Sequence, residues 1–192
     1  MSNTNTNTPG NVSAGKPKIT GAVFRAPAGT TPPTDSSTSL AEAFKALGYV
    51  SSDGVTNSNN VSTQTVRAWG GDVVDVPLSE KTDTFKLKLI EALNVDVLKT
   101  VFGDGNVTGS ALASGISVSV NSADYPEGVW VIDQLLKGNT AKRIVIPKGK
   151  ISELEDIVYK DSEVISYGLT ISCLPDGDGN THYEYIKTVS TT

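Results

Sequence analysis

The clearest alternation of apolar and polar side chains in this chain lies between residues 84 and 89. Phe85, Leu87 and Leu89 would point to one side of an extended chain, and the residues next to them are polar. A period of two is typical of a β-strand with one buried face. Burial of each of these three side chains should stabilise the fold by roughly 1.5–3 kcal/mol. We therefore expect a strand in residues 80–89 to organise the core.

The apolar period changes to that of a helix directly after this strand. Asn94 is a favoured N-cap residue, and Asp96 would lie in the positive first turn. Gly103 offers the left-handed conformation in which many helices end. The apolar positions between them recur at helical spacing and are Val97, Leu98, Val101 and Phe102. A short helix ending at residue 102 is predicted.

A second short helix is predicted to begin at Ser39. Ser39 and Glu42 have the spacing of a capping box, in which each side chain bonds a backbone N–H of the first turn. Gly48 would end the helix. Its apolar face would comprise Leu40, Ala43, Phe44 and Leu47. Because the segment is short, tertiary packing has to stabilise it.

Apolar alternation and continuous apolar runs predict strands along much of the remaining chain. Residues 128–136 are apolar on both sides, which predicts a central strand. A turn at Gly138-Asn139 would join it to a return strand that Pro147 ends. The predicted strands are 19–25, two segments within 49–69, 80–89, 116–120, 128–136, 142–146, 164–173 and 183–187.

These elements predict a mainly β fold, a β-sandwich or barrel with one or two short flanking α-helices. We expect a single domain over residues 19–192, preceded by a flexible, polar N-terminal arm of residues 1–18. The side chains expected to anchor the core are Phe44, Phe85, Leu87, Leu89, Val101, Phe102, Trp130, Ile165 and Tyr167.

A long polar segment interrupts the predicted strands at residues 51–60. Eight of its ten residues are Ser, Asp, Gly or Asn, which favour turns, so we expect a long loop. Loops of this length are usually mobile or functional. Further along, Trp69 is a large anchor followed by a flexible Gly70-Gly71 corner.

Composition narrows the range of partners. Lys and Arg total 16 against 21 Asp and Glu, a net charge of −5 at pH 7. This charge argues against a protein that grips nucleic acid by neutralising phosphates, but it is compatible with letting nucleic acid pass. The chain shows neither a signal peptide nor an apolar run long enough to span a bilayer, so we expect a soluble protein with no membrane partner.

The residue types that most often carry chemistry are sparse. His182 is the only histidine, and nothing at motif spacing would orient it for catalysis. Cys173 is the only cysteine and continues an apolar strand face. Residues 176–180 resemble the start of a calcium loop, but Thr181 and Lys187 stand where the bend glycine and the bidentate acid belong. We expect no enzyme activity, no cofactor and no metal site.

Long strands leave open sheet edges whose backbone N–H and C=O groups need partners. The strands at 116–120 and 164–173 contain little Lys or Pro, so we expect edges to pair with the next copy of the same protein. The arm and the 51–60 loop would then connect rings and order on assembly. The residues expected at these contacts are Asp53, Gly54, Val55, Thr56, Asn57, Trp69 and Asp72.

Several motifs together resemble the major tail tube proteins of long-tailed, siphovirus-type bacteriophages. They lie at residues 48–56 (GYVSSDGVT), 68–72 (AWGGD), 80–85 (EKTDTF), 91–94 (EALN), 102–109 (FGDGNVTG), 172–176 (SCLPD) and 183–185 (YEY). The resemblance covers most of residues 19–187. It implies a structural protein of the virion tail, with a β-sandwich or barrel subunit and a flanking helix.

The same resemblance implies hexameric rings stacked into a tube, whose typically acidic bore conducts double-stranded DNA from the capsid to the host cell. It also implies contacts with tail terminator, tape-measure and tail-tip proteins, and assembly in the cytoplasm of the host bacterium. Lys86 and Lys88 lie on the polar face of the strand at 80–89. Because they would present positive charge to DNA, we do not assign that face to the bore.

A second hypothesis is a phage tail-tip or surface adhesin, a β-sandwich that binds a host glycan or receptor. Such a protein needs an exposed aromatic platform. The aromatic residues available for it are Tyr49, Trp69, Tyr125, Trp130, Tyr183 and Tyr185. Most of them occupy positions where core anchors are expected.

Overall fold

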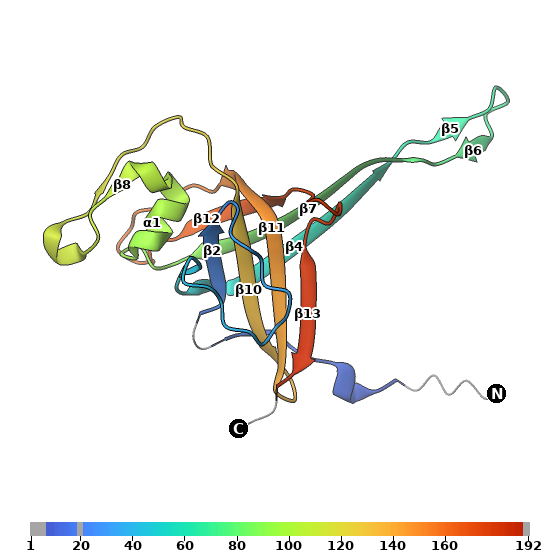
Figure 1. The fold of residues 1–192 in the computed structure, drawn as a ribbon. Coiled ribbons are helices and arrows are strands. Elements are labelled where there is room, and N and C mark those ends of the chain that lie inside the picture. The colour runs from blue at the N-terminus through green and yellow to red at the C-terminus, as the bar shows by residue number, and fades with distance from the viewer. Residues whose placement is uncertain (1–6, 19–20, 190–192) are drawn as a thin grey trace.

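The computed structural model describes residues 7–18 and 21–189. Over these residues it is mainly antiparallel β-sheet with one α-helix, which confirms the expected mainly β fold and is consistent with a β-sandwich (Figure 1). The strands are β1 (Lys16–Pro17), β2 (Val23–Pro27), β3 (Lys45–Ala46), β4 (Val50–Thr63), β5 (Val66–Arg67), β6 (Val73–Asp75), β7 (Leu78–Leu89), β8 (Val107–Thr108), β9 (Ser117–Val118), β10 (Gly128–Leu136), β11 (Thr140–Leu154), β12 (Tyr167–Cys173) and β13 (Tyr183–Thr188). The helix is α1 (Val95–Phe102), and the 3-10 helices are η1 (Pro9–Asn11), η2 (Asp104–Asn106) and η3 (Leu112–Ser114).

The long strand β11 links two groups of strands into one sheet. Its first half pairs with β10 and β13, and its second half pairs with β12. The ladder then runs from β12 through β7 to β4, all antiparallel. In Figure 1 the strands β12, β7 and β4 cross the direction of β10, β11 and β13. One continuous sheet therefore folds over and packs its two parts against each other.

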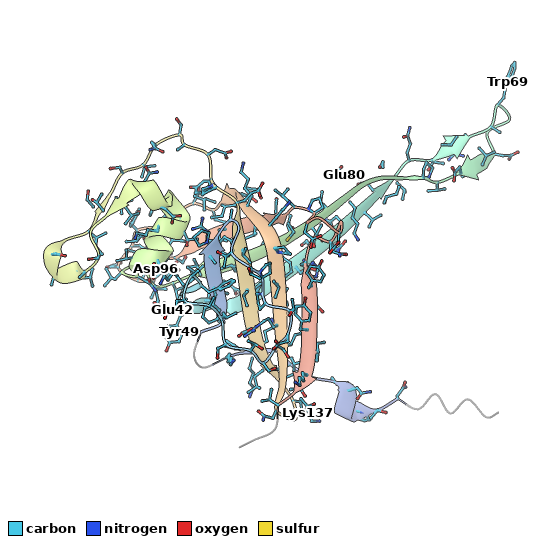
Figure 2. All side chains as sticks on the ribbon, viewed as in Figure 1. Glu42, Tyr49, Trp69, Glu80, Asp96 and Lys137 are labelled. Atoms are coloured by element: carbon cyan, nitrogen blue, oxygen red, sulfur yellow. The ribbon has the colours of Figure 1, made fainter. Side chains whose placement is uncertain are left out.

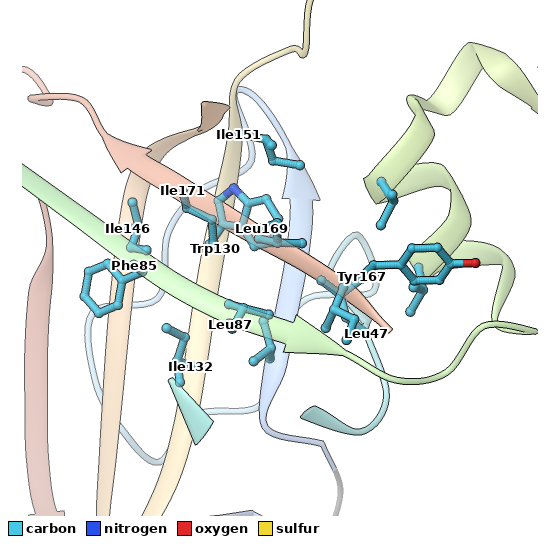
Figure 3. Packing of buried hydrophobic residues seen from close by; sticks show 14 of the residues in the cluster. Leu47, Phe85, Leu87, Trp130, Ile132, Ile146, Ile151, Tyr167, Leu169 and Ile171 are labelled. Carbon is cyan, nitrogen blue, oxygen red and sulfur yellow. The ribbon is translucent and has the colours of Figure 1, made fainter. Parts of the chain in front are cut away.

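The main core lies between these two parts of the sheet (Figure 3). Phe85, Leu87 and Leu89 are buried, as the alternation predicts, and they pack with buried side chains of β10, β11 and β12. Trp130 is the largest buried side chain, and its indole N–H donates to the Gly149 carbonyl at 3.3 Å. A Cβ at residue 149 would lie 2.5 Å from the Trp130 ring, so glycine is required there.

A second, smaller core covers the other face of β10. Val129 and Val131 are buried here, whereas Trp130 and Ile132 face the main core, so the prediction of a strand buried on both sides is confirmed. The segment between β2 and β3 lies over this face. Beneath it Arg143 makes two bonds to the Asp133 carboxylate, at 2.7 and 2.8 Å, and donates to the carbonyls of Asp35 and Thr38.

The helix predicted after the central strand is confirmed as α1. Asn94 caps it by accepting a hydrogen bond from the Asp96 N–H at 3.0 Å. Gly103 follows with φ +96°, a conformation that favours glycine. The helix buries Val97, Leu98 and Val101 against the main core. Phe102 is partly buried beside it, with its ring edge-on to Tyr167.

The helix predicted from Ser39 is wrong. Residues 39–44 form no helix, and Lys45–Ala46 is the short strand β3 paired with β2. The physical reason is the position of the two large apolar residues: Phe44 is buried in the second core and Leu47 in the main core. A helix would place both on one face, whereas the extended chain sends them to opposite sides of the sheet.

The loop predicted at residues 51–60 is also wrong, because these residues belong to β4. Residues 55–63 of β4 pair with β7 from Leu87 to Leu78. The turn-forming residues have only a local effect on the strand. The register of the β4–β7 ladder shifts between Val50 and Val55, and Gly54 has φ +72°. The partner β7 is a strong strand with a second edge to satisfy, and this outweighs the turn preference of Ser and Asn.

Three further boundaries differ from the sequence predictions. Pro147 does not end the return strand, because β11 continues through it to Leu154. The proline lies where the partner changes from β13 to β12, so its missing N–H removes no bond from either ladder. The strand predicted at 116–120 is reduced to β9, and β12 begins at Tyr167, which leaves Ile165 partly buried outside it.

The described part of the N-terminal arm contacts the body of the subunit. β1 pairs with Leu135 and Gln134 of β10, and the Ser13 hydroxyl accepts a hydrogen bond from the Lys137 N–H at 2.7 Å. Residues 1–6 and residues 19–20, part of the first predicted strand, lie outside the described residues.

Candidate assembly interface

A long β-hairpin projects from the body of the subunit (Figure 1). β4 and β7 form its base, and the two-stranded sheet of β5 and β6 extends it. All residues from 61 to 82 are exposed. We call this segment the distal hairpin. At about 3.3 Å per residue, the stretch from Asp72 to Thr82 spans roughly 35 Å.

The distal hairpin carries an unusual number of exposed apolar side chains. Trp69 is fully exposed at its tip, as Figure 2 shows. The exposed apolar residues behind the tip are Val61, Val66, Val73, Val74, Val76 and Leu78. A segment that buries none of its own apolar residues has little to gain from folding alone, and exposed apolar patches of this kind mark protein contacts.

A buried polar cluster holds the root of the hairpin. Asp83 is 3 % exposed, and its carboxylate accepts hydrogen bonds from Asn57 Nδ2 at 2.7 Å, Thr181 Oγ1 at 2.6 Å and His182 Nδ1 at 2.5 Å. Burial works to raise the pKa of Asp83, but these three bonds outweigh burial and leave its pKa below the ordinary value. The imidazole of His182 packs edge-on against Phe85. The cluster therefore joins β4, β7 and the segment before β13 where the hairpin leaves the body.

Two sheet edges are open over long stretches. Within the described part of the chain, β4 pairs only with β7, and β13 pairs only with β11. On the other side of each strand, the described residues include no paired strand. Such rows of N–H and C=O groups are templates for strands of another chain.

Glutamates at the end of β11 and directly after it neutralise the lysines on the polar face of β7. Lys86 forms an ion pair with Glu153 at 3.7 Å, and Lys88 forms one with Glu155 at 2.9 Å. The hydrogen bond that Lys88 donates to Glu155 is the main cause that raises the pKa of Lys88 above its ordinary value. The face is thus a mixture of charges rather than a positive surface.

The residues predicted at subunit contacts lie in two separate places. Asp53, Gly54 and Thr56 are exposed near the start of β4, and Trp69 and Asp72 are exposed in the turn at the tip of the distal hairpin (Figure 2). Val55 and Asn57 are partly engaged by the body of the molecule: Val55 packs against the main core, and Asn57 donates to Asp83 and to the Thr84 carbonyl.

Sequence reasoning missed the apolar residues on the second half of the distal hairpin. The signal was present, because Gly70-Gly71 lies between two Val-containing segments, Val66 and Val73–Asp75. Gly71 has φ +94°, and the Ala68 carbonyl accepts a hydrogen bond from its N–H at 2.9 Å. A glycine turn between two β-branched segments is a hairpin signal.

Cys173 and Asp176, two residues of the types that can carry chemistry, make contacts that belong to the fold. Burial is the main cause that raises the pKa of the Cys173 thiol to about 12, which keeps it protonated. The Asp176 carboxylate accepts hydrogen bonds from Tyr183 and from two backbone N–H groups of its own turn. Within residues 7–18 and 21–189, no cluster of three or more His, Cys, Asp or Glu side chains is arranged to hold a metal ion. No helix in the same ranges is long and apolar enough to cross a membrane.

Fold and surface together define a class of protein: a β-sandwich subunit whose distinctive exposed features are open edges and a projecting apolar hairpin. Comparison with protein families identifies that class more closely. The chain matches the family described as "Phage tail tube protein" over residues 9–191, and it belongs to this family. A search of curated proteins gives no match. The protein is therefore a structural component of a phage tail.

Proposed function

We propose that this protein assembles with itself into hexameric rings, and that the rings stack into the tail tube of a long-tailed, siphovirus-type phage. The observation that supports this most is the distal hairpin, whose exposed apolar residues have no partner surface on their own strands. A hairpin that projects roughly 35 Å beyond its root is long enough to reach a subunit of the next ring.

Within a ring, the open edges of β4 and β13 are the surfaces through which neighbours pair. Each edge offers backbone groups that only another strand satisfies fully. A head-to-tail contact of this kind closes into a ring when its rotation divides a full turn. The start of β4 keeps the role proposed for Asp53, Gly54 and Thr56, now as an exposed strand edge rather than a loop.

The bore of the tube would conduct double-stranded DNA without binding it. A charge of −5 per subunit, repeated around each ring, would repel phosphates. The ion pairs of Lys86 and Lys88 remove the positive charge that argued against the polar face of β7 as a bore lining. Tail terminator, tape-measure and tail-tip proteins would be the further partners, and assembly would occur in the cytoplasm of the host bacterium.

The adhesin hypothesis has less support. Tyr125, Tyr183 and Tyr185 pack against the two cores, and Trp130 is buried. The exposed rings of Tyr49 and Trp69 lie at opposite ends of the molecule and form no shared platform (Figure 2).

Sedimentation and electron microscopy of the purified protein test the proposal. We expect long hollow particles of one diameter that grow with protein concentration. Particles that remain monomeric at high concentration contradict the proposed function. Tight binding of glycans by those monomers would favour the adhesin instead.

A further inference from the structure

Hydrogen bonds close the turn that presents the Trp69 indole at the tip of the distal hairpin. The Ala68 N–H donates to the Asp72 carbonyl at 2.8 Å, and Arg67 Nη1 donates to the Gly71 carbonyl at 2.9 Å. These bonds fix the turn that carries Trp69, which is fully exposed. Tryptophan is among the residues most enriched in binding hot spots, because its large surface gains most from leaving water.

A groove of about 720 Å³ lies at the opposite end of the same hairpin, where β4 begins. Its size falls within the range of roughly 300–1,000 Å³ typical of sites that enclose a ligand, so an indole fits. Ile132, Val50 and Val55 supply apolar side chains to it. The remaining walls are mostly small residues, which leave room for a large ring: Gly15, Gly21, Ala22, Ala46, Gly48 and Gly54.

The tip and the groove belong to opposite ends of one molecule. Figure 2 places Trp69 at one end and Tyr49, which lines the groove, at the other. The paired strands of β4 and β7 hold the two apart, so a subunit cannot fill its own groove. A contact between them therefore joins two copies head to tail, and contacts of this type propagate along an axis.

Resting on the proposed function, we propose that Trp69 of one copy inserts into this groove on a copy in the adjacent ring. The charges match. The tip carries a cation and an anion on either side of the indole, Arg67 and Asp72. The groove is lined by an anion and a cation, Glu91 and Lys18.

The groove also offers an acceptor for the indole N–H, which needs one when buried. The Glu91 carboxylate receives one bond at each oxygen, from the Tyr49 N–H and from Asn94 Nδ2, both at 2.9 Å. Each carboxylate oxygen accepts more than one bond, so Glu91 has capacity for a further donor.

The first test measures the critical concentration for tube formation in Trp69→Ala, Trp69→Phe and Tyr159→Ala. Tyr159 is the matched control, since it is an exposed aromatic residue outside both the tip and the groove. We expect the critical concentration to rise about tenfold or more for Trp69→Ala, less for Trp69→Phe, and not at all for Tyr159→Ala. A Trp69→Ala protein that assembles like the wild type overturns the proposal.

The second test places Trp69 directly, with cysteines at Gly70 and Ser51. A Cβ at Gly70 meets no atom within 4 Å, Ser51 lines the groove, and the native Cys173 is buried. Mild oxidation of Gly70→Cys/Ser51→Cys tubes should give a ladder of covalent oligomers, whereas Gly70→Cys/Val120→Cys tubes should not. Tubes without the ladder contradict this contact alone. Failure of the wild-type protein to form tubes contradicts the proposed function as well.

Discussion

Asp83 is the residue on which the root of the distal hairpin depends most. Its carboxylate accepts hydrogen bonds from three side chains, one on β4 and two in the segment before β13. A buried carboxylate with three donors fixes the relative positions of its partners, because each lost bond would leave a buried polar group unsatisfied. The direction in which the hairpin projects therefore depends on this cluster.

We predict that Asp83→Asn lowers the free energy of unfolding by about 2 kcal/mol at neutral pH, since an amide cannot accept all three bonds. The folded pKa of Asp83 lies below its unfolded value. Its stabilisation is thus complete above the unfolded pKa, near 3.9, and is lost as the pH falls through the folded pKa. The measurement is urea unfolding from pH 7 down to pH 3.

In that series the stability difference between wild type and Asp83→Asn should shrink toward acid pH. Asp161→Asn, at an exposed position, is the control. A difference that stays constant to pH 3 would show that the charge of Asp83 has no stabilising role.

Arg143 has the same function for the second core. Its guanidinium is 2 % exposed, and its bonds fix Asp133 together with the segment between β2 and β3. We predict that Arg143→Met lowers the free energy of unfolding by about 3–5 kcal/mol, because it leaves Asp133 buried with only the more distant Lys18 at 3.8 Å. The double change Arg143→Met/Asp133→Leu should cost less in the same denaturant experiment. An equal or larger cost would rule out an uncompensated charge as the reason.

At the scale of elements, sequence periodicity located most of the core strands and missed those that depend on a partner. β7, β10, β12 and α1 follow from their own alternation or spacing. β4 does not, because its Ser- and Asn-rich sequence becomes a strand only beside β7. The failed helix at Ser39 has the same origin, since pairing with β2 outweighs a good local capping signal.

The candidate site was predictable only in part, for the same reason. Trp69 and Asp72 were found from a short motif, and the structure places them at a hairpin tip. The groove could not be predicted, because it combines residues of β1, β3, β4 and β10, and only the folding of the whole sheet brings these strands together.

We predict that the distal hairpin is dispensable for folding and necessary for stacking. The variant replaces residues 64–77 by Asn-Gly, which closes the ladder at the Thr63–Leu78 pair with a two-residue turn. Because all the deleted side chains are exposed, the midpoint of thermal unfolding should stay within a few degrees of the wild-type value. Tube formation, followed by light scattering, should be lost. Normal tube growth by this variant would remove the hairpin from the assembly contact.

At the scale of the whole molecule, the protein combines a well-packed body with surfaces that its own chain leaves unsatisfied. The body has two cores, and segments of the same chain cover each of them. We therefore expect the subunit to fold before it assembles. No described segment covers the distal hairpin or pairs with the open edges of β4 and β13. A polymer of identical subunits requires this combination: a body that is stable by itself, and extensions whose polar and apolar groups find partners on a neighbouring copy.

Cryo-electron microscopy of tubes grown from the purified protein is the decisive measurement. We expect six subunits per ring, strand pairing between neighbours at the β4 and β13 edges, and a distal hairpin that crosses to the adjacent ring with Trp69 in the groove at the start of β4. A reconstruction in which the hairpin folds back on its own subunit, with both edges exposed to solvent, would contradict it.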